Sequence, residues 1–303
     1  MDWPKSCPTQ VPMQGVSVGP HYQLVPTRHG SMLVNRNDLF MGQSFLHYGE
    51  CCQFEIDTLL QLLSHPQASH GLVIEAGSNM GVHTIALAQL LTKQNRPMLA
   101  FEPQQVIFQQ LCANLALNAL MNVTALPCAC SSQPGTLRFD EPDYGQPGNF
   151  GGTALTGSPT AITHRTRTVP AFALDQLVAT HFPHQPVALI KIDVEGHELQ
   201  VLQGAQTLLD RDHPILYLEN DRIEHSETLI RWLFTQDYRL WWHITPAFNP
   251  RNYLQNPENI YPNIVSPNMI ALHPSRSITL QGLEEITDPT HHPLARSVVS
   301  ASE

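Results

Sequence analysis

The sequence has no run of basic side chains and few charges of either sign. Charged residues make up 14% of its 303 residues, and Asp and Glu outnumber Lys and Arg by 26 to 16. Proteins that bind nucleic acid generally need a positive surface that displaces the counterions of the phosphate backbone. The formal net charge of −10 therefore argues against DNA or RNA as a partner.

Long apolar segments are missing as well. No uninterrupted apolar run approaches the ~20 residues that a transmembrane helix needs. Residues 1–5 lack the basic start and apolar stretch of a secretory signal peptide. None of the six cysteines forms a C-x-x-C pair, so we interpret them as reduced thiols. These features predict a cytoplasmic protein without a membrane span.

Strand-like and helical patterns alternate through the middle of the chain. Short apolar runs typical of buried strands occupy residues 72–74, 98–101, 123–129, 187–192 and 215–218. Helical patterns follow at residues 82–91, 104–120, 197–209 and 224–234. This alternation predicts a mostly parallel, Rossmann-like α/β sheet with helices on both faces. Residues 238–242 and 269–272 are expected to close the sheet as an antiparallel pair.

Three segments lie outside this core domain of residues 71–273. Residues 1–70 are predicted to form an N-terminal extension, with a loosely ordered lead-in to about residue 30 and a later helix that packs on the core. Residues 131–168 are rich in Pro, Gly, Ser and Thr and predict an inserted loop, either a substrate loop or a plain surface loop. Residues 274–303 lose all periodicity and are expected to be poorly ordered.

The strongest motif is E-A-G-S-N-M-G at residues 75–81, between a strand and a helix. Its glycines permit a tight turn and let a ligand approach the backbone beside the unpaired N–H groups of the helix start. The motif is not G-x-G-x-x-G, and no Lys-Ser or Lys-Thr pair follows, which excludes a P-loop. The Glu75 carboxylate suits an amino group better than a pyrophosphate. A purely structural turn is the alternative interpretation.

A second motif, F-E-P, ends the next strand at residues 101–103. Glu102 follows Gly77 by 25 positions, and an acidic residue placed there can accept both ribose hydroxyls of an adenine nucleoside. Pro103 fits the first turn of the following helix, where its missing N–H breaks no hydrogen bond. Alone, the motif would indicate only a helix start. Combined with the glycine turn, it predicts nucleoside binding.

A third motif, K-I-D-V-E-G-H-E, follows the most apolar strand at residues 191–198. Its ionisable side chains are expected at the carboxyl ends of the strands, where open α/β sheets bind ligands. Asp193 and Glu195 are candidates for acid–base roles. His197 and His243 are weaker candidates for a base, and a cap or surface position is the alternative for each. We interpret Glu198 as a helix cap.

Together with Leu174-Asp175 at a helix start, these motifs resemble the FkbM family of methyltransferases. The similarity in order and spacing runs from about residue 48 to 218, and more loosely to 272. The family commonly has Asp at the position of Glu75, a departure that keeps the charge. The resemblance implies a class I methyltransferase sheet and S-adenosylmethionine as cofactor. It also implies methyl transfer to a hydroxyl oxygen of a small-molecule acceptor, a sugar or glycan, or a polyketide.

Residue roles follow from the resemblance by position. The methionine part of the cofactor would be held by Glu75, Gly77, Ser78, Asn79 and Gly81. Glu102 and Pro103 would lie at the ribose, and Ala129 and Cys130, at the tip of the third strand, would edge the adenine. Asp193 and Glu195 would face the methyl group and the acceptor.

Other interpretations remain open at this point. An NAD-dependent oxidoreductase would share the sheet, although its tighter glycine pattern is missing, and a non-catalytic cofactor-binding module would share the motifs. Asp193, Glu219 and Asn220 end adjacent strands, and their oxygens predict a Mg²⁺ site, with a helix cap as the alternative for Asn220. The sequence predicts no oligomeric state.

Overall fold

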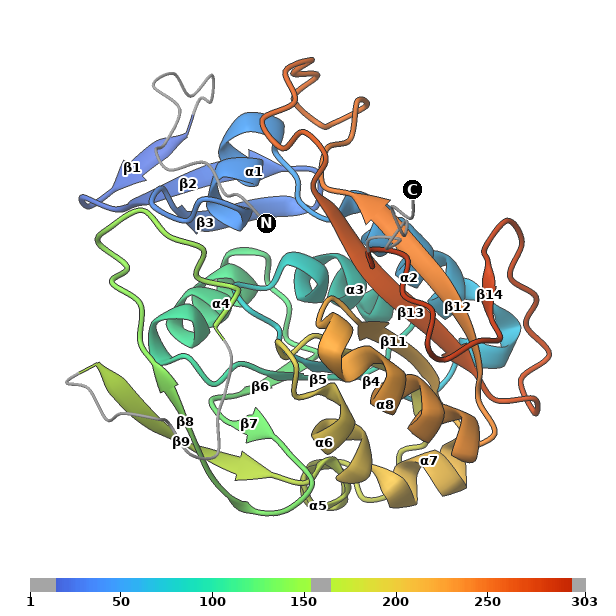
Figure 1. The fold of residues 1–303 in the computed structure, drawn as a ribbon. Helices are drawn as coiled ribbons and strands as arrows, with labels where there is room; N and C mark the ends of the chain where they lie inside the picture. The colour runs from blue at the N-terminus through green and yellow to red at the C-terminus, as the bar shows by residue number, and fades with distance from the viewer. Residues whose placement is uncertain (1–14, 154–164, 296–303) are drawn as a thin grey trace, which may run out of the picture.

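The computed structural model describes residues 15–153 and 165–295 and has an eight-stranded sheet at its centre (Figure 1). Its five parallel strands, in spatial order, are β6 (Val123–Leu126), β5 (Met98–Phe101), β4 (Leu72–Ala76), β10 (Val187–Ile192) and β11 (Ile215–Glu219). The antiparallel β13 (Val265–Leu272) lies between β11 and β12 (Arg239–Pro246), and β14 (Glu285–Ile286) pairs with β12. The predicted α/β sheet and its antiparallel closing pair are confirmed.

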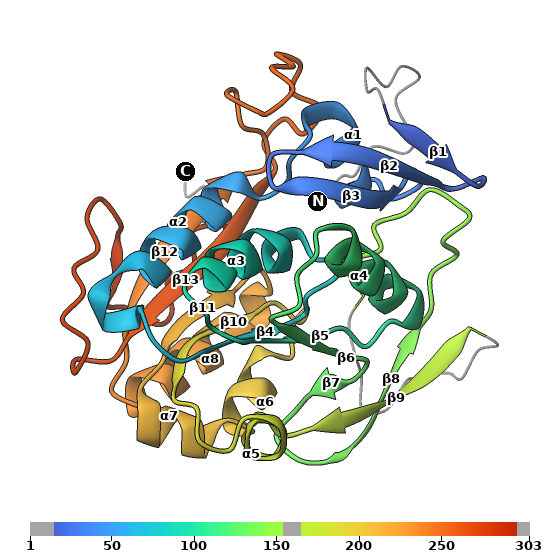
Figure 2. The same cartoon turned by 180° about the vertical axis from the view of Figure 1, so that it is seen from behind.

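Helices cover both faces of this sheet (Figures 1 and 2). One face carries α2 (Gln53–Ser64), α3 (Val82–Lys93) and α4 (Gln105–Leu117). The other carries α5 (Leu174–His181), α6 (Glu198–Gln203), α7 (Gln206–Asp212) and α8 (Ile223–Thr235). Successive residues of β4 pack alternately into the two cores, Val73 into the first and Leu72 and Ile74 into the second. A strand buried on both faces needs apolar residues at every position, which explains the continuous apolar runs.

The N-terminal segment contains a small sheet where a loosely ordered lead-in was expected, so that expectation is wrong from residue 16 onward. β1 (Val16–Val18), β2 (Tyr22–Thr27) and β3 (Gly30–Asn35) are antiparallel, and α1 (Met41–Tyr48) leads from them toward α2. Asn114 links this small sheet to α4, since its Oδ1 accepts a hydrogen bond from the Leu33 N–H of β3 at 2.6 Å. Polar residues interrupt all three strands, so a search for apolar runs misses them.

The predicted third strand breaks after Leu126. β7 (Ala129–Cys130) leaves the central sheet and joins β9 (Thr166–Phe172), which pairs on its other side with β8 (Gly135–Asp140). The predicted insertion therefore contains strands at both of its ends. Residues 154–164 lie outside the described part of the chain.

The C-terminal segment is more ordered than expected over the residues that the structure describes. β14 lies in it, and the buried His292 donates its Nε2–H to the backbone oxygen of Asn220 at 2.8 Å. Neither β14 nor His292 belongs to a periodic pattern, so the sequence contains no signal that predicts them. In the described ranges, no helix combines the length and apolarity needed to cross a bilayer.

Candidate active site

A cavity of about 590 Å³ opens at the carboxyl ends of β4, β5, β10 and β11. Residues of all three sequence motifs line it: Gly77, Asn79, Glu102, Pro103, Asp193, Val194 and Glu195. The rest of the wall comes from segments distant in sequence, and includes Cys52, Glu55, His83, Asn149, Gly151, Arg222 and Ser266. Six predicted site residues thus meet in one pocket, together with Glu219 at the end of β11.

The glycine turn is shaped by its contact with the third motif. Gly77 has a φ of +85°, and a Cβ built on it would lie 1.8 Å from the backbone oxygen of Asp193. The Asp193 N–H in turn donates to the Ala76 oxygen at 3.0 Å. Only a residue without a side chain permits this approach, so Gly77 fixes the distance between two of the motifs.

Gly77→Ala is expected to lower the free energy of unfolding by more than ~1–2 kcal/mol, the strain of the left-handed conformation alone. The overlap with the Asp193 carbonyl adds to that strain. Gly135→Ala is the matched control, because a Cβ at Gly135 meets no atom within 4 Å. Urea midpoints measure both effects. Equal midpoints for the two variants would show that the turn tolerates a side chain.

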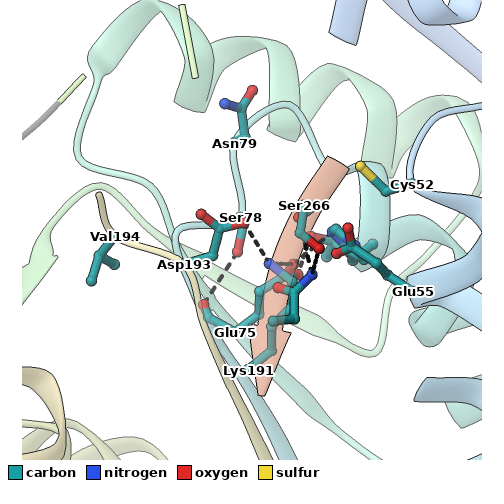
Figure 3. Close-up of polar contacts among 12 residues, drawn as sticks. Cys52, Glu55, Glu75, Ser78, Asn79, Lys191, Asp193, Val194 and Ser266 are labelled. Atoms are coloured by element: carbon teal, nitrogen blue, oxygen red, sulfur yellow. Dashed lines mark hydrogen bonds and ion pairs between the residues drawn. The ribbon is translucent and has the colours of Figure 1, made fainter. Parts of the chain in front are cut away.

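Glu75 and Ser78 lie behind the turn instead of on the pocket wall (Figure 3). Glu75 is fully buried, and its Oε2 accepts a hydrogen bond from Thr84 Oγ1 at 2.6 Å. Ser78 Oγ donates to the Glu75 backbone oxygen at 3.2 Å. Gly81 is also absent from the wall. The structure thus brings Gly77 and Asn79 of this motif to the pocket, and the other three support the turn.

Glu102 faces the pocket from the end of β5 and binds the turn through its carboxylate. Its Oε2 accepts a hydrogen bond from the Asn79 N–H at 3.0 Å, and its Oε1 accepts one from the Gln104 N–H at 2.7 Å. Burial raises the pKa of Glu102 to about 7, against these two hydrogen bonds, which lower it. Each oxygen keeps a further lone pair that can accept a ligand hydroxyl.

Two cofactor candidates and two base candidates lie outside the pocket wall. Ala129 and Cys130 are buried in β7 and do not line the pocket, because the chain leaves the central sheet after Leu126. His197 is also off the wall, and its Nε2 lies 3.0 Å from Ser131 Oγ. His243 is fixed between Tyr217 and Thr58, outside the pocket.

A carboxylate cluster formed by Asp193, Glu195 and Glu219 lines the pocket, with the Asp193 backbone directly beside the glycine turn. One carboxylate oxygen from each lies within 4.8 Å of the others. Burial opposes ionisation of Asp193, but the Lys191 ammonium at 3.1 Å outweighs it and lowers the Asp193 pKa. Burial and the charge of Asp193 raise the pKa of Glu219 well above its ordinary value. Asp193 is therefore the ionised member of the cluster.

Glu195 and Glu198 have different surroundings. Burial and the nearby Asp193 raise the pKa of Glu195 to about 8, although Glu195 forms an ion pair with Arg222. Glu198 accepts hydrogen bonds from the backbone N–H groups of Val194 and Gly196, which matches its interpretation as a cap.

Asn220 does not reach the carboxylate cluster, contrary to the predicted metal set. Its amide donates to Ser226 Oγ at 2.9 Å and to Met269 Sδ at 3.2 Å. The side chain is buried behind β11, because it points to the face opposite Glu219. Glu195 takes the third place in the cluster instead.

The strand order, with an antiparallel strand inserted next to the last parallel one, and the glycine turn at the tip of β4 define a Rossmann-like class I methyltransferase fold. Residues 75–240, more than half of the chain, match the family model described as the methyltransferase FkbM domain. The chain belongs to this family, as the resemblance implied.

Two curated relatives are similar over part of their length. Methyltransferase sdnD from Sordaria araneosa is 30% identical over 170 residues, which cover 48% of this chain and 62% of the relative. The hexuronic acid methyltransferase AglP from Haloferax volcanii is 29% identical over 151 residues, which cover 50% of this chain and 56% of the relative. The chain thus spans less than two thirds of the length of either relative.

Solved structures resemble the chain more distantly. The methyltransferase FkbM from Methylobacillus flagellatus has 15% sequence identity and a TM-score of 0.43, covering 66% of this chain and 43% of its own. A protein of Streptococcus mutans in complex with SAH has 12% identity and a TM-score of 0.41, covering 73% and 96%.

Proposed function

We propose that the protein is an S-adenosylmethionine-dependent methyltransferase that methylates a hydroxyl oxygen on a sugar, glycan or polyketide-type acceptor. The observation that carries the proposal is the meeting of Gly77, Asn79 and Glu102 with an ionised Asp193 on the wall of one pocket. AglP, by its name a hexuronic acid methyltransferase, supports an acceptor of the sugar class.

The cofactor-side wall fits an adenine nucleoside that carries an amino acid. The bare backbone at Gly77 permits close approach, and Glu102 offers lone pairs for two ribose hydroxyls. The ionised Asp193 carboxylate favours a positively charged ligand. S-adenosylmethionine, when bound, supplies a methyl group on a positively charged sulfonium.

Asp193 is the proposed proton acceptor. Methyl transfer is a displacement in which the acceptor oxygen bonds to the methyl carbon as the carbon–sulfur bond breaks, and the hydroxyl proton must leave. The Asp193 carboxylate is ionised and 28% exposed to the pocket, while Lys191 beneath it is 2% exposed. Lys191 therefore orients the base and keeps it ionised, and the pocket aligns the two reactants.

The described part of the insertion is proposed to cover the pocket. Gln104 anchors it, since its Nε2 donates to the Phe150 oxygen at 3.1 Å and its Oε1 accepts from Tyr144 Oη at 3.0 Å. Gly151 and Gly152 then form part of the wall. This anchoring beside Glu102 supports a position of the loop over the cofactor side as well as the acceptor side. Residues 154–159 lie outside the described ranges.

A magnesium ion at the carboxylate cluster is a second hypothesis, with Glu195 in place of Asn220. Three carboxylates form a hard donor set, but burial and the charge of Asp193 raise the pKa of Glu219, which favours its protonated form and opposes ion binding. Magnesium binding should therefore tighten as the pH rises. Calorimetric titration with Mg²⁺ at two pH values tests this, and an absence of binding at the higher pH refutes the hypothesis.

Two measurements test the proposed function. Calorimetry should detect binding of S-adenosylmethionine and none of NAD, and the reverse result would make the protein an oxidoreductase candidate. Transfer of a labelled methyl group should then be detected on a panel of glycans and polyketide alcohols. Cofactor binding without transfer to any member would favour a non-catalytic module.

A further inference from the structure

The pocket wall formed by α2 and α3 holds a second group of potential metal ligands, separate from the carboxylate cluster. Cys52 precedes the first turn of α2, Glu55 lies in that turn, and His83 lies in the first turn of α3. One ligand atom from each lies within 4.8 Å of the others. All three residues line the pocket, and Figure 3 shows Cys52 and Glu55 beside each other.

The donor set and its spacing suit zinc. Zinc accepts thiolate, imidazole and carboxylate ligands at ~2.0–2.3 Å, which places tetrahedral ligands roughly 3.3–3.8 Å apart. His83 Nε2 and Glu55 Oε2 are already 3.1 Å apart. The thiol therefore has to move by about 1.5 Å at most to complete three corners of a tetrahedron. The fourth corner faces the pocket, as in zinc sites that act on a substrate.

The surroundings of the three ligands favour a metal as well. Zinc-bound histidines usually donate their second ring N–H to a carboxylate or carbonyl. His83 Nδ1 lies 3.8 Å from Glu75 Oε1, a buried oxygen that has no hydrogen-bond partner among the described residues. Thr245 Oγ1 meanwhile donates to the second oxygen of Glu55 at 3.1 Å. Both ligands that have a second polar atom, His83 and Glu55, thus have a supporting group near that atom, Glu75 and Thr245 respectively.

A hydrogen bond between His83 and Glu55 leaves Glu75 Oε1 without a hydrogen bond, with only the Lys191 ammonium at 3.6 Å. When neutral His83 donates its Nε2–H to Glu55, its Nδ1 lone pair faces the Glu75 carboxylate, and two acceptors oppose each other. An ion on Nε2 moves the ring proton to Nδ1, from which it points toward Glu75. A doubly protonated His83 would also donate to both Glu55 and Glu75. It is therefore the alternative to a bound ion.

The charges around Cys52, Glu55 and His83 favour the binding of a cation. Glu55, Glu75 and Asp193 all lie near the single Lys191 ammonium, which is 3.6 Å from Glu75 and 3.1 Å from Asp193. The negative charges exceed the positive one in a region that is almost fully buried. A divalent ion bound with loss of the Cys52 thiol proton would add one net positive charge and reduce this imbalance.

We propose that Cys52, Glu55 and His83 bind a zinc ion whose open position faces the acceptor side of the pocket. Binding converts the Cys52 thiol to a thiolate and releases its proton to solvent. The bound ion can polarise an acceptor hydroxyl, a role that rests on the proposed methyltransferase function. The ion itself does not depend on that function, so its presence is measured separately.

The test uses Co²⁺ as a spectroscopic substitute for zinc in the full-length protein after chelator treatment and dialysis. One equivalent of Co²⁺ should produce thiolate-to-cobalt charge-transfer absorption, and one equivalent of Zn²⁺ should remove it. Cys52→Ser should abolish this absorption, and His83→Gln should weaken Co²⁺ binding at least tenfold. Glu75→Gln should weaken it about 10–100-fold through the orientation of His83.

Two control variants decide whether the assignment is correct. Cys51→Ser removes the neighbouring thiol, whose Sγ lies 3.4 Å from that of Cys52, and should keep the absorption. Asp193→Asn removes one carboxylate of the carboxylate cluster and should also keep the charge-transfer absorption. The proposal is wrong if the wild type shows no charge-transfer absorption or if Cys52→Ser keeps it. A doubly protonated His83 would then be the explanation for the arrangement of Glu55 and Glu75. Binding of S-adenosylmethionine to the same sample, measured by calorimetry, tests the methyltransferase proposal independently.

Discussion

Asp193→Asn is expected to lower kcat by about 10²–10⁴-fold, the usual contribution of a positioned general base. Asparagine keeps the size of the side chain but cannot accept the acceptor's proton at neutral pH. The Lys191 ammonium also loses a partner at 3.1 Å, although Glu75 remains at 3.6 Å. Affinity for S-adenosylmethionine should fall much less than kcat, since the Gly77 turn and Glu102 are untouched. Single-turnover kinetics with saturating cofactor measure the effect.

The pH dependence separates Asp193 from Glu195 as the base. The pKa of Asp193 is held below its ordinary value, so Asp193 stays deprotonated at every pH above that value. Glu195, with a pKa of about 8, is mostly protonated at neutral pH. Activity that is flat from pH 6 to 9 supports Asp193. Activity that rises about tenfold per pH unit up to pH 8, and is kept in Asp193→Asn, would assign the reaction to Glu195.

The sequence was sufficient to predict the central sheet because burial on both faces leaves a continuous apolar run. It was also sufficient for Glu102 and Asp193, since each directly follows such a run and parallel strands bring their carboxyl ends together. Ala129 and Cys130 show the limit of this reasoning. They continue an apolar run in sequence, but Pro127 interrupts the strand, and the chain joins a different sheet.

The acceptor side of the pocket could not be predicted in the same way. Cys52 and Glu55 lie on a helix whose apolar stripe indicates only that it packs on the core. Their approach to His83 depends on how α2 and α3 pack against each other. No local sequence pattern predicts that packing. His83 had one available signal, its position two residues after the Gly81 that ends the glycine turn. All three residues lie outside the motifs on which the family resemblance rests: Cys52 and Glu55 precede the glycine turn, and His83 follows it.

Family membership and acceptor specificity therefore rest on different parts of the chain. The family model begins at Glu75 and ends in β12, and it covers the cofactor-side wall and Asp193. Cys52 and Glu55 precede that segment, and Ser266 follows it. Residues outside the shared domain thus form much of the remaining wall, so the acceptors of relatives that match only this domain do not fix the acceptor here.

Glu102→Ala is expected to weaken binding of S-adenosylmethionine by at least two orders of magnitude. Hydrogen bonds to a charged group contribute roughly 1.5–3 kcal/mol each, and the variant loses two to the ribose hydroxyls. It also loses the contacts with the Asn79 and Gln104 N–H groups, which shape the adjoining turn. Glu102→Gln keeps an acceptor oxygen without the charge and should fall between wild type and alanine. Calorimetry measures the affinities, and urea midpoints confirm that both variants fold.

The pH dependence of cofactor affinity tests the same carboxylate without a mutation. Burial raises the pKa of Glu102 to about 7, so in the unbound protein about half of the Glu102 side chains are protonated at that pH. A protonated carboxyl accepts fewer hydrogen bonds, so ribose hydroxyls favour the ionised form. Affinity should therefore fall up to tenfold for each pH unit below 7 and level off above 8, and Glu102→Gln should remove that dependence. An equal affinity in wild type at pH 6 and pH 8, together with an unchanged Glu102→Ala, would mean that the ribose binds elsewhere in the pocket.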